Sequence, residues 1–247
     1  MSKIIAVIPC RYASSRFPGK PLALIGDKPM MWHVYQRAIE SNVFDEIVIA
    51  TEDDRILKVS KELQLDAVCT NANHRTGTDR VAEVSSQIEA EYYVNIQGDE
   101  PFIDPNSIKA VANKITDCSD PLIHAANAYT ELDNINEILD VNNVKVVMNY
   151  KNLALAFSRY PVPYPKENRG KYCKQLGLYA FKKSGLQKFI ENKPLDLELT
   201  EGVEMYRLLE HGYQIQMILT KDSSISVDTP ADLMRAENLF NLENFEY

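Results

Sequence analysis

Short apolar runs that alternate with amphipathic segments restrict the fold of this chain more than any other feature. Each run holds four to seven residues rich in Val, Ile, Ala or Tyr, as in strands buried on both faces. Apolar residues between the runs recur every three or four positions, as on one side of a helix. The predicted strands are residues 3–9, 46–50, 66–69, 92–96 and 122–128. This alternation predicts a mostly parallel sheet with helices on both faces.

The pattern changes after residue 144. Residues 144–148 and 153–157 resemble two paired strands, and residues 158–164 contain prolines that exclude a central strand. Other predicted elements are helices at 29–41, 105–115, 132–139, 198–210 and 230–242, and strands at 175–181 and 215–219. We expect a single domain over residues 1–247, in which residues of about 150–212 form a smaller inserted α+β subdomain.

A cluster of positive charge follows the first predicted strand. Residues 10–22, CRYASSRFPGKPL, hold Arg11, Arg16 and Lys20 among small residues and a Pro-Gly turn. Arginine and lysine bind phosphate through charge-assisted hydrogen bonds, so this loop suits a polyanion. The alternative is a basic loop that is only solvated.

Two further polar stretches follow predicted strands, at residues 71–80 and 97–101. The carboxyl ends of parallel strands share one edge of a sheet, and ligands bind there at the switch in strand order. We therefore expect one pocket to collect both stretches and the basic loop.

Two aspartates in this arrangement suit a metal ion. Mg²⁺ prefers one or two protein carboxylates together with phosphate oxygens and water. Asp99 follows a predicted strand, and Asp228 precedes Thr229 and Pro230 at the start of the last predicted helix. The alternative for each aspartate is a helix N-cap.

Composition excludes several classes of function. The net charge of −8 argues against nucleic-acid or anionic-membrane partners. The four cysteines lack Cys-x-x-Cys spacing, which fits reduced thiols rather than a disulfide or zinc framework. The apolar start is too short for a signal peptide and no apolar stretch is long enough to span a membrane, so we expect a cytoplasmic protein. Neither a Walker A loop nor a dinucleotide fingerprint occurs.

Seven stretches occur in an order typical of one family. They read RYASSRFPGKPL, NHRTGTDR, NIQGDEP, VKVV, FSRYPVPYP, QLGLYAF and VDTP. Together they resemble the CMP-Kdo synthetases, which are 3-deoxy-manno-octulosonate cytidylyltransferases. The resemblance implies a Rossmann-like nucleotidyltransferase fold, a homodimer, CTP and Mg²⁺, and an inserted region for dimerisation and sugar binding. The implied reaction is attack of an anomeric sugar hydroxyl on the α-phosphate of CTP with release of pyrophosphate, for cell-surface polysaccharide synthesis (lipopolysaccharide or capsule).

The same resemblance assigns roles to individual residues. The residues implied in catalysis are Lys20, Arg11 and Asp99, and the metal ligands are Asp99 and Asp228. The implied nucleotide contacts are Arg11, Arg16, Lys20, Thr76, Gly77, Arg80 and Gln97. The implied sugar contacts are Gln97, Arg159, Gln175, Tyr179, Glu204 and Met205.

The likeness is weaker at the sugar end. This chain has Gln175-Leu176-Gly177 where the family usually has His-Leu-Gly, and Glu-Met-Tyr-Arg at 204–207 where it usually has Glu-Gln-Leu-Arg. A buried site that loses hydrogen-bonding groups changes its ligand. We therefore expect a cytidylyltransferase for octulosonate or a close relative, with an amino-octulosonate, a nonulosonate or another anionic alcohol as alternatives. A non-catalytic nucleotide-binding protein on the same scaffold is the remaining alternative.

Overall fold

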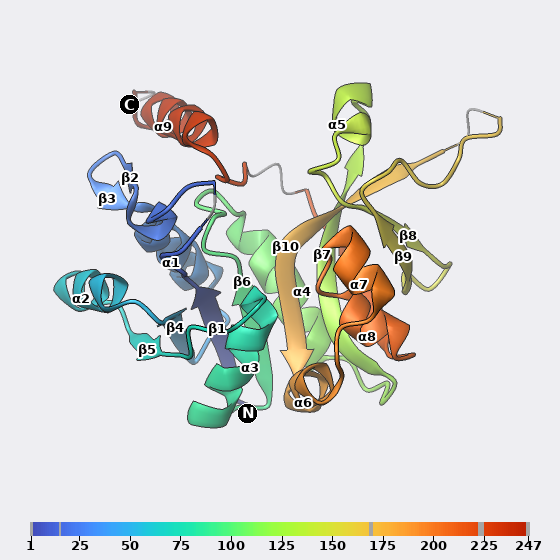
Figure 1. Cartoon of the computed structure of the whole chain (residues 1–247), viewed down its shortest axis with the longest axis horizontal. Coiled ribbons are helices and arrows are strands. Elements are labelled where there is room, and N and C mark those ends of the chain that lie inside the picture. Colours follow the sequence, from blue (N-terminus) through green and yellow to red (C-terminus); the bar gives the residue numbers. More distant parts are fainter. Residues whose placement is uncertain (1, 15, 168–169, 222–224, 246–247) are drawn as a thin grey trace.

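A large central sheet organises the computed structural model, which describes residues 2–14, 16–167, 170–221 and 225–245 (Figure 1). Seven strands follow the order β11-β7-β10-β6-β1-β4-β5. Their bounds are β1 (Ile4–Pro9), β4 (Glu46–Thr51), β5 (Ala67–Cys69), β6 (Tyr92–Ile96), β7 (Ile123–Leu132), β10 (Tyr172–Lys182) and β11 (Gln214–Leu219). Every neighbouring pair in this order is parallel except the pairs of β10, which is antiparallel to β6 and β7. The predicted mostly parallel sheet is confirmed.

The strands are buried because their side chains alternate between two apolar cores. In β1, Ile5 and Val7 belong to one core, whereas Ile4, Ala6 and Ile8 belong to the other. The first core includes side chains of α3 (Gly77–Gln87), α6 (Lys183–Glu191) and α8 (Tyr206–Glu210), and the second those of α1 (Met30–Ser41), α2 (Asp54–Glu62) and α4 (Pro105–Thr116). Burial on both faces explains why these strands read as continuous apolar runs.

Most predicted boundaries agree with the structure within a few residues. The strand at 92–96 matches β6, and the helices at 29–41 and 105–115 match α1 and α4. The helix predicted at 132–139 is shorter, because β7 continues to Leu132. Asn134 then caps α5 (Ile135–Leu139) by accepting a hydrogen bond from the backbone of Asn136.

Residues 150–212 contribute to the main sheet as well as to its periphery. The predicted strand pair is present as β8 (Lys145–Met148) and β9 (Ala154–Ser158), which pair antiparallel beside β10. β10 itself lies between β6 and β7 at the middle of the sheet (Figure 1). The treatment of this range as an inserted subdomain stays a prediction.

The single helix predicted at 198–210 is wrong. The chain forms two short helices, α7 (Asp196–Glu201) and α8, which are separated by Gly202 with a φ of 64°. A residue in the left-handed conformation ends a helix, and glycine adopts that conformation without a Cβ penalty. A further helix, α6, was not predicted; it directly follows β10 and buries Leu186 and Phe189.

The C-terminal helix α9 (Pro230–Phe245) begins where the sequence predicts. Asp232 accepts hydrogen bonds from the Thr229 backbone N–H and hydroxyl at 2.9 and 2.7 Å. The Thr229 hydroxyl accepts in return from the Asp232 N–H at 3.3 Å. This reciprocal pair is a capping box. Thr229 therefore caps the helix, and the Asp228 side chain is available for other contacts.

A completely buried lysine ties two loops of the smaller strand pair together. The Lys145 ammonium donates to the carbonyl oxygens of Asp140, Asn143 and Arg159 at 2.9, 2.6 and 2.6 Å. Burial lowers the pKa of Lys145. An ammonium has three donors and no acceptor, so these three carbonyls satisfy it completely.

Replacing Lys145 with Met should destabilise the protein, because three carbonyl oxygens would lose their donor. We expect a loss on the order of 3 kcal/mol in the free energy of unfolding, since each buried unsatisfied acceptor costs about 1–3 kcal/mol. Urea unfolding followed by circular dichroism would show a lower midpoint. The control Lys58→Met alters a side chain that is 77% exposed and should change stability by less than about 0.5 kcal/mol. Equal midpoints for K145M and wild type would contradict the structural role of Lys145.

Candidate active site

A cavity of about 550 Å³ lies where β1 and β6 end, at the switch in strand order. This volume is typical of a pocket for a small ligand. The predicted site residues that line it are Arg11, Arg16, Lys20, Thr76, Gly77, Arg80, Gln97, Asp99, Gln175, Tyr179, Glu204 and Asp228. The three polar stretches that follow strands in the sequence therefore meet in one pocket, as expected from a parallel sheet.

The basic loop is built to hold Lys20 in a fixed direction. Gly19, with a φ of 74°, turns the chain into a short 3₁₀ helix, η1 (Lys20–Leu22). The hydroxyl end of the Tyr12 ring lies against Gly19. The Arg55 guanidinium stacks over the face of the same ring, 3.2 Å from its centroid. The neighbouring Cys10 is buried, which raises the pKa of its thiol to about 12, so Cys10 is a packing residue rather than a nucleophile.

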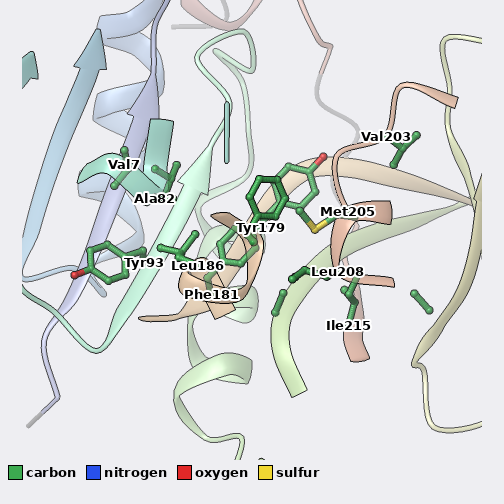
Figure 2. Packing of buried hydrophobic residues seen from close by; sticks show 14 of the residues in the cluster. Val7, Ala82, Tyr93, Tyr179, Phe181, Leu186, Val203, Met205, Leu208 and Ile215 are labelled. Atoms are coloured by element: carbon green, nitrogen blue, oxygen red, sulfur yellow. The ribbon is translucent and has the colours of Figure 1, made fainter. Parts of the chain in front are cut away.

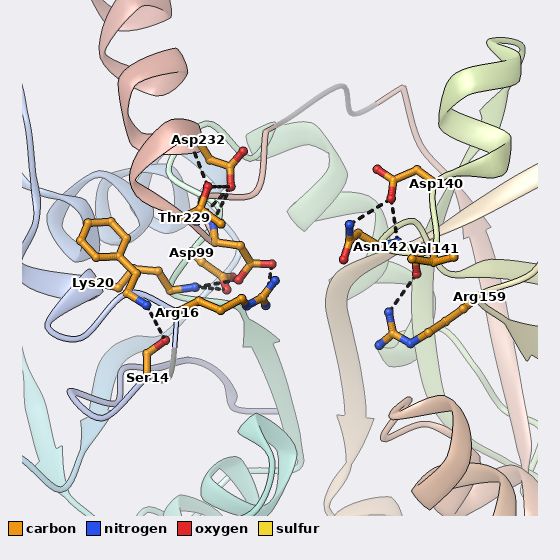
Figure 3. A network of polar contacts seen from close by, with 12 residues as sticks. Ser14, Arg16, Lys20, Asp99, Asp140, Val141, Asn142, Arg159, Thr229 and Asp232 are labelled. Carbon is orange, nitrogen blue, oxygen red and sulfur yellow. Dashed lines mark hydrogen bonds and ion pairs between the residues drawn. The ribbon is translucent and has the colours of Figure 1, made fainter.

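Lys20 contacts both aspartates that the sequence predicts as metal ligands, and Figure 3 shows its contact with Asp99. Its ammonium is 2.7 Å from Asp99 and 3.2 Å from Asp228, and Arg16 lies 3.0 Å from the second Asp228 oxygen. Burial would lower the pKa of Lys20, but the Asp99 and Asp228 carboxylates outweigh it and raise that pKa. Three distant segments of the chain thus place opposite charges within contact distance.

The carboxylate pair fits a divalent metal that also binds phosphate. In the described part of the chain, no group of three or more His, Cys, Asp or Glu side chains forms a metal cluster. Asp99 and Asp228 both contact one ammonium, so a single cation bridges them in this structure. Two carboxylates alone suit Mg²⁺, because it completes its shell with phosphate oxygens and water.

The first turn of α3 forms a second wall of the cavity. Thr76 and Asp79 make a capping box, in which Asp79 accepts from both the backbone N–H and the hydroxyl of Thr76 at 3.0 Å. Arg80 is buried and bonds to Thr70 and to Glu52, the latter at 2.6 Å. Its guanidinium is therefore a fixed positive charge at the cavity wall.

Gln97 connects the α3 wall to β10. A Cβ added to Gly77 would lie 2.9 Å from the Gln97 amide, and a Cβ added to Gly177 would lie 2.9 Å from its side-chain carbon. The side chain therefore fits between two glycines and is confined there. This close approach explains why both positions carry no side chain.

A bulge in β10 directs two polar side chains into the cavity. The register of β10 against β7 shifts between Gln175 and Tyr179, and Asn127 donates to the carbonyls of Leu176 and Leu178 at 2.9 Å each. The Gln175 amide then donates to the Tyr179 hydroxyl at 2.9 Å. Burial raises the pKa of Tyr179 well above its usual value, so this phenol stays protonated.

Glu204 links the α7–α8 turn to α3. Its carboxylate accepts a hydrogen bond from the Thr78 backbone N–H at 3.1 Å. Burial raises the pKa of Glu204, and the hydrogen bonds from Thr76 and Thr78 offset this rise only in part. The predicted sugar-contact residue is therefore also part of the protein's own hydrogen bonding.

Two predicted sugar contacts lie outside the cavity lining. Met205 is fully buried in the apolar core with Leu208 and Phe181 (Figure 2), so a direct sugar contact of Met205 is not supported. Arg159 lies across from the Lys20 cluster (Figure 3) and donates to the carbonyls of Glu201 and Val141 at 2.6 and 3.0 Å. Its guanidinium lies beside Gly202, which lines the cavity: a Cβ placed on Gly202 would be 3.5 Å from Arg159 Nη2.

Some lining residues were not predicted. Ser14 and Arg75 belong to the polar stretches, and the positive charge of Arg75 next to Thr76 was a usable signal. Glu198 and Val203 come from α7 and the turn after it, where no pattern marked them. With Arg75 the cavity has five lining cations, Arg11, Arg16, Lys20, Arg75 and Arg80, in a chain of net charge −8.

None of the described helices has both the length and the apolar character that a membrane span requires.

Comparisons with known proteins agree with this geometry. Residues 5–220 match the model of a family described as Cytidylyltransferase. A 3-deoxy-manno-octulosonate cytidylyltransferase of Syntrophotalea carbinolica is 43% identical over 245 residues, 95% of this chain and 97% of the relative. One of Leptospira interrogans is 42% identical over 234 residues, 94% of each chain. A solved structure of CMP:2-keto-3-deoxy-manno-octonic acid synthetase complexed with CTP is 37% identical, with a TM-score of 0.92 over 98% of this chain and 100% of that one. The predicted nucleotidyltransferase fold is confirmed.

The half-buried Glu204 should give a measurable pH dependence of stability. Because its pKa is raised on folding, its contribution to stability is complete below the unfolded pKa of about 4.3 and is lost as pH rises through the folded pKa. Gln lacks this titration and still offers an acceptor to Thr78. We expect the Tm of E204Q to equal that of wild type near pH 4 and to exceed it increasingly as the pH rises toward 8.

Differential scanning calorimetry across this pH range measures the difference in Tm. The control Glu62→Gln changes a carboxylate that is 59% exposed and should show no such trend. A difference in Tm between E204Q and wild type that is constant with pH would contradict the raised pKa of Glu204.

Proposed function

Because this chain belongs to the cytidylyltransferase family, we propose that it couples CTP to a 3-deoxy-2-keto sugar acid, giving a CMP-sugar and pyrophosphate. The chain is a nucleotidyltransferase, and the predicted family resemblance is confirmed. The named relatives are 3-deoxy-manno-octulosonate cytidylyltransferases, so octulosonate or a close relative is the proposed acceptor. Cell-surface polysaccharide synthesis is the corresponding proposed role.

The observation that carries the proposal is the pairing of loop cations with two carboxylates in one cavity. Arg16 and Lys20 contact Asp99 and Asp228 in this structure. A triphosphate and a divalent metal bring the opposite pair of charges: phosphate oxygens match the cations, and the metal matches the carboxylates. The cavity thus has a partner for each charge of a metal–nucleotide complex.

The proposed chemistry needs positioning and charge neutralisation more than covalent participation. The anomeric hydroxyl attacks the α-phosphorus, a new P–O bond forms, and the bond to the pyrophosphate oxygen breaks. Arg11, Arg16 and Lys20 would neutralise the charge that develops on the leaving pyrophosphate. Each has a long side chain on the loop after β1 and can face the same phosphate chain.

A divalent metal is the general cofactor of this family, and we propose Mg²⁺ held by Asp99 and Asp228. When bound, the metal supplies neutralising charge to the phosphate oxygens. In this structure the Lys20 ammonium occupies the space between the two carboxylates. Lys20 must therefore leave them when it contacts the triphosphate.

Nucleotide and acceptor are proposed to occupy opposite ends of the cavity. The first turn of α3, with Thr76, Gly77 and the fixed charge of Arg80, would contact cytosine and ribose. At the other end the proposed acceptor contacts are Gln97, Gln175, Tyr179, Glu204 and Arg159. Arg159 suits a sugar carboxylate because its planar fork binds carboxylates bidentately.

A second acceptor class is favoured by one observation at Gln175. Its side-chain oxygen is buried without a hydrogen-bond partner among the described residues, although Gln175 lines the cavity. A buried acceptor without a donor is costly, so a ligand that donates there is favoured. A charged amino group donates more strongly at this point than a sugar hydroxyl, so an amino-octulosonate is the alternative acceptor.

We also propose a homodimer. Several large apolar side chains are exposed on α5, β9 and the segment after β9, including Leu139, Leu155, Tyr160 and Tyr164, which are 59%, 57%, 75% and 87% exposed. Large exposed apolar side chains are typical of surfaces that associate. Sedimentation velocity would show twice the chain mass, and a monomer at micromolar concentration would contradict the dimer.

Pyrophosphate release tests the proposed function most directly. The protein is incubated with CTP, Mg²⁺ and each of a panel of acids: octulosonate, its amino analogue and a nonulosonate. We expect CTP-dependent release with one of the octulosonates and little with ATP, GTP or UTP. Release with none of the acids would contradict the proposal, and CTP binding without release would favour the non-catalytic alternative.

Replacing Asp99 with Asn should remove most activity without loss of the fold. The variant lacks one of the two carboxylates for the metal and leaves Lys20 with a single anionic partner. We expect kcat to fall at least about a hundredfold, the size of effect seen when one electrostatic group is removed from a preorganised site. The control Asp27→Asn alters a carboxylate that is 82% exposed and should retain wild-type kcat. Wild-type kcat in D99N would exclude Asp99 from the metal site.

A further inference from the structure

One buried cation behind the cavity has no role in the proposed chemistry. Arg207 on α8 has a side chain only 5% exposed, and its guanidinium lies 4.0 Å over the ring of Phe189. It donates to both oxygens of Glu198 at 2.9 and 2.6 Å, and to Asp79 at 2.5 Å. One guanidinium therefore joins a carboxylate of α7 to a carboxylate of α3.

Both partners of Arg207 are directly connected to the cavity. Glu198 lines it from α7. Asp79 uses one oxygen for Arg207 and the other for the backbone N–H and hydroxyl of Thr76, which also lines the cavity. The position of Thr76, and of the helix turn that it caps, is thus tied to Arg207 through a single carboxylate.

A second contact joins the same two segments. Glu204, three residues before Arg207, accepts from the Thr78 N–H in the first turn of α3. The segment 204–207 therefore holds two consecutive residues of that turn: Thr78 through its backbone N–H and Asp79 through its side chain. A lysine could not reproduce this, because only the guanidinium fork binds one carboxylate bidentately and a second one at the same time.

We propose that Arg207 is a positioning residue that holds the nucleotide end of the cavity in place from the acceptor-side helices. Without its fork, the buried Glu198 and the half-buried Asp79 lose their shared partner, and Asp79 no longer has a fixed orientation from which to hold Thr76. The inference rests on the proposed function for the identity of the two ends. CTP binding alone tests it, so it is judged separately from turnover.

Isothermal titration calorimetry of CTP to Arg207→Lys, Asp79→Asn and the double variant tests the bridge. R207K keeps the charge and loses the fork, whereas D79N keeps an acceptor for the Thr76 cap and loses the ion pair. We expect each single variant to weaken CTP binding about tenfold. We expect the double variant to bind CTP no more weakly than the weaker of the two single variants. The reason is that both substitutions break the same Arg207–Asp79 ion pair.

Leu208→Ala is the matched control for loss of stability. Leu208 is the next residue of α8, is completely buried, and contacts neither carboxylate through a polar group. This variant should lower the Tm and leave the Kd for CTP unchanged. A wild-type Kd in R207K, with or without a lower Tm, would make Arg207 a structural residue only and overturn the proposal. Weakening in the double variant equal to the product of the two single effects would also overturn it.

Steady-state kinetics separates this inference from the proposed function. With an acceptor that supports release, R207K should raise the KM for CTP more than it lowers kcat, because the reacting groups remain in place. A protein that binds CTP and releases no pyrophosphate would contradict the proposed function, while the Kd values would still decide the role of Arg207. A kcat loss in R207K with an unchanged KM for CTP would overturn the positioning role.

Discussion

The structure depends on opposite charges that three distant segments bring to one edge of a sheet. Lys20 from the loop after β1 lies between Asp99, after β6, and Asp228, before α9. Each group would be costly to hold partly buried alone, and together they neutralise one another. The same charges are suited to separate when a metal–nucleotide complex offers each its own partner. The site is therefore arranged so that one set of ion pairs can be exchanged for another.

The remainder of the fold places the proposed acceptor end of the cavity next to this charge cluster. β10 runs against the direction of its neighbours, and its bulge directs Gln175 and Tyr179 toward the cavity. The turn after Gly202 brings Glu204 and Arg207 to the first turn of α3. Both ends of the cavity thus share rigid supports, which favours the fixed geometry that transfer between two bound substrates needs.

Much of the proposed nucleotide end of the cavity could be predicted from sequence, because it depends on local patterns. β1 and β6 are continuous apolar runs, and polar loops after parallel strands meet at one edge by geometry. The acceptor end depends on long-range contacts instead. Gly202 divides a region of helical periodicity into α7 and α8, which turns Met205 into the core. The antiparallel placement of β10 and the partners of Arg159 likewise have no signature in nearby residues.

The measurement that tests the central claim most directly is a crystal structure with CTP and Mg²⁺ bound. We expect the Lys20 ammonium to contact a phosphate oxygen and no longer to lie between the carboxylates. We also expect Asp99 and Asp228 both to coordinate the metal, with the cytosine at the first turn of α3. A bound nucleotide with Lys20 still 2.7 Å from Asp99, and the metal held elsewhere, would contradict the central claim.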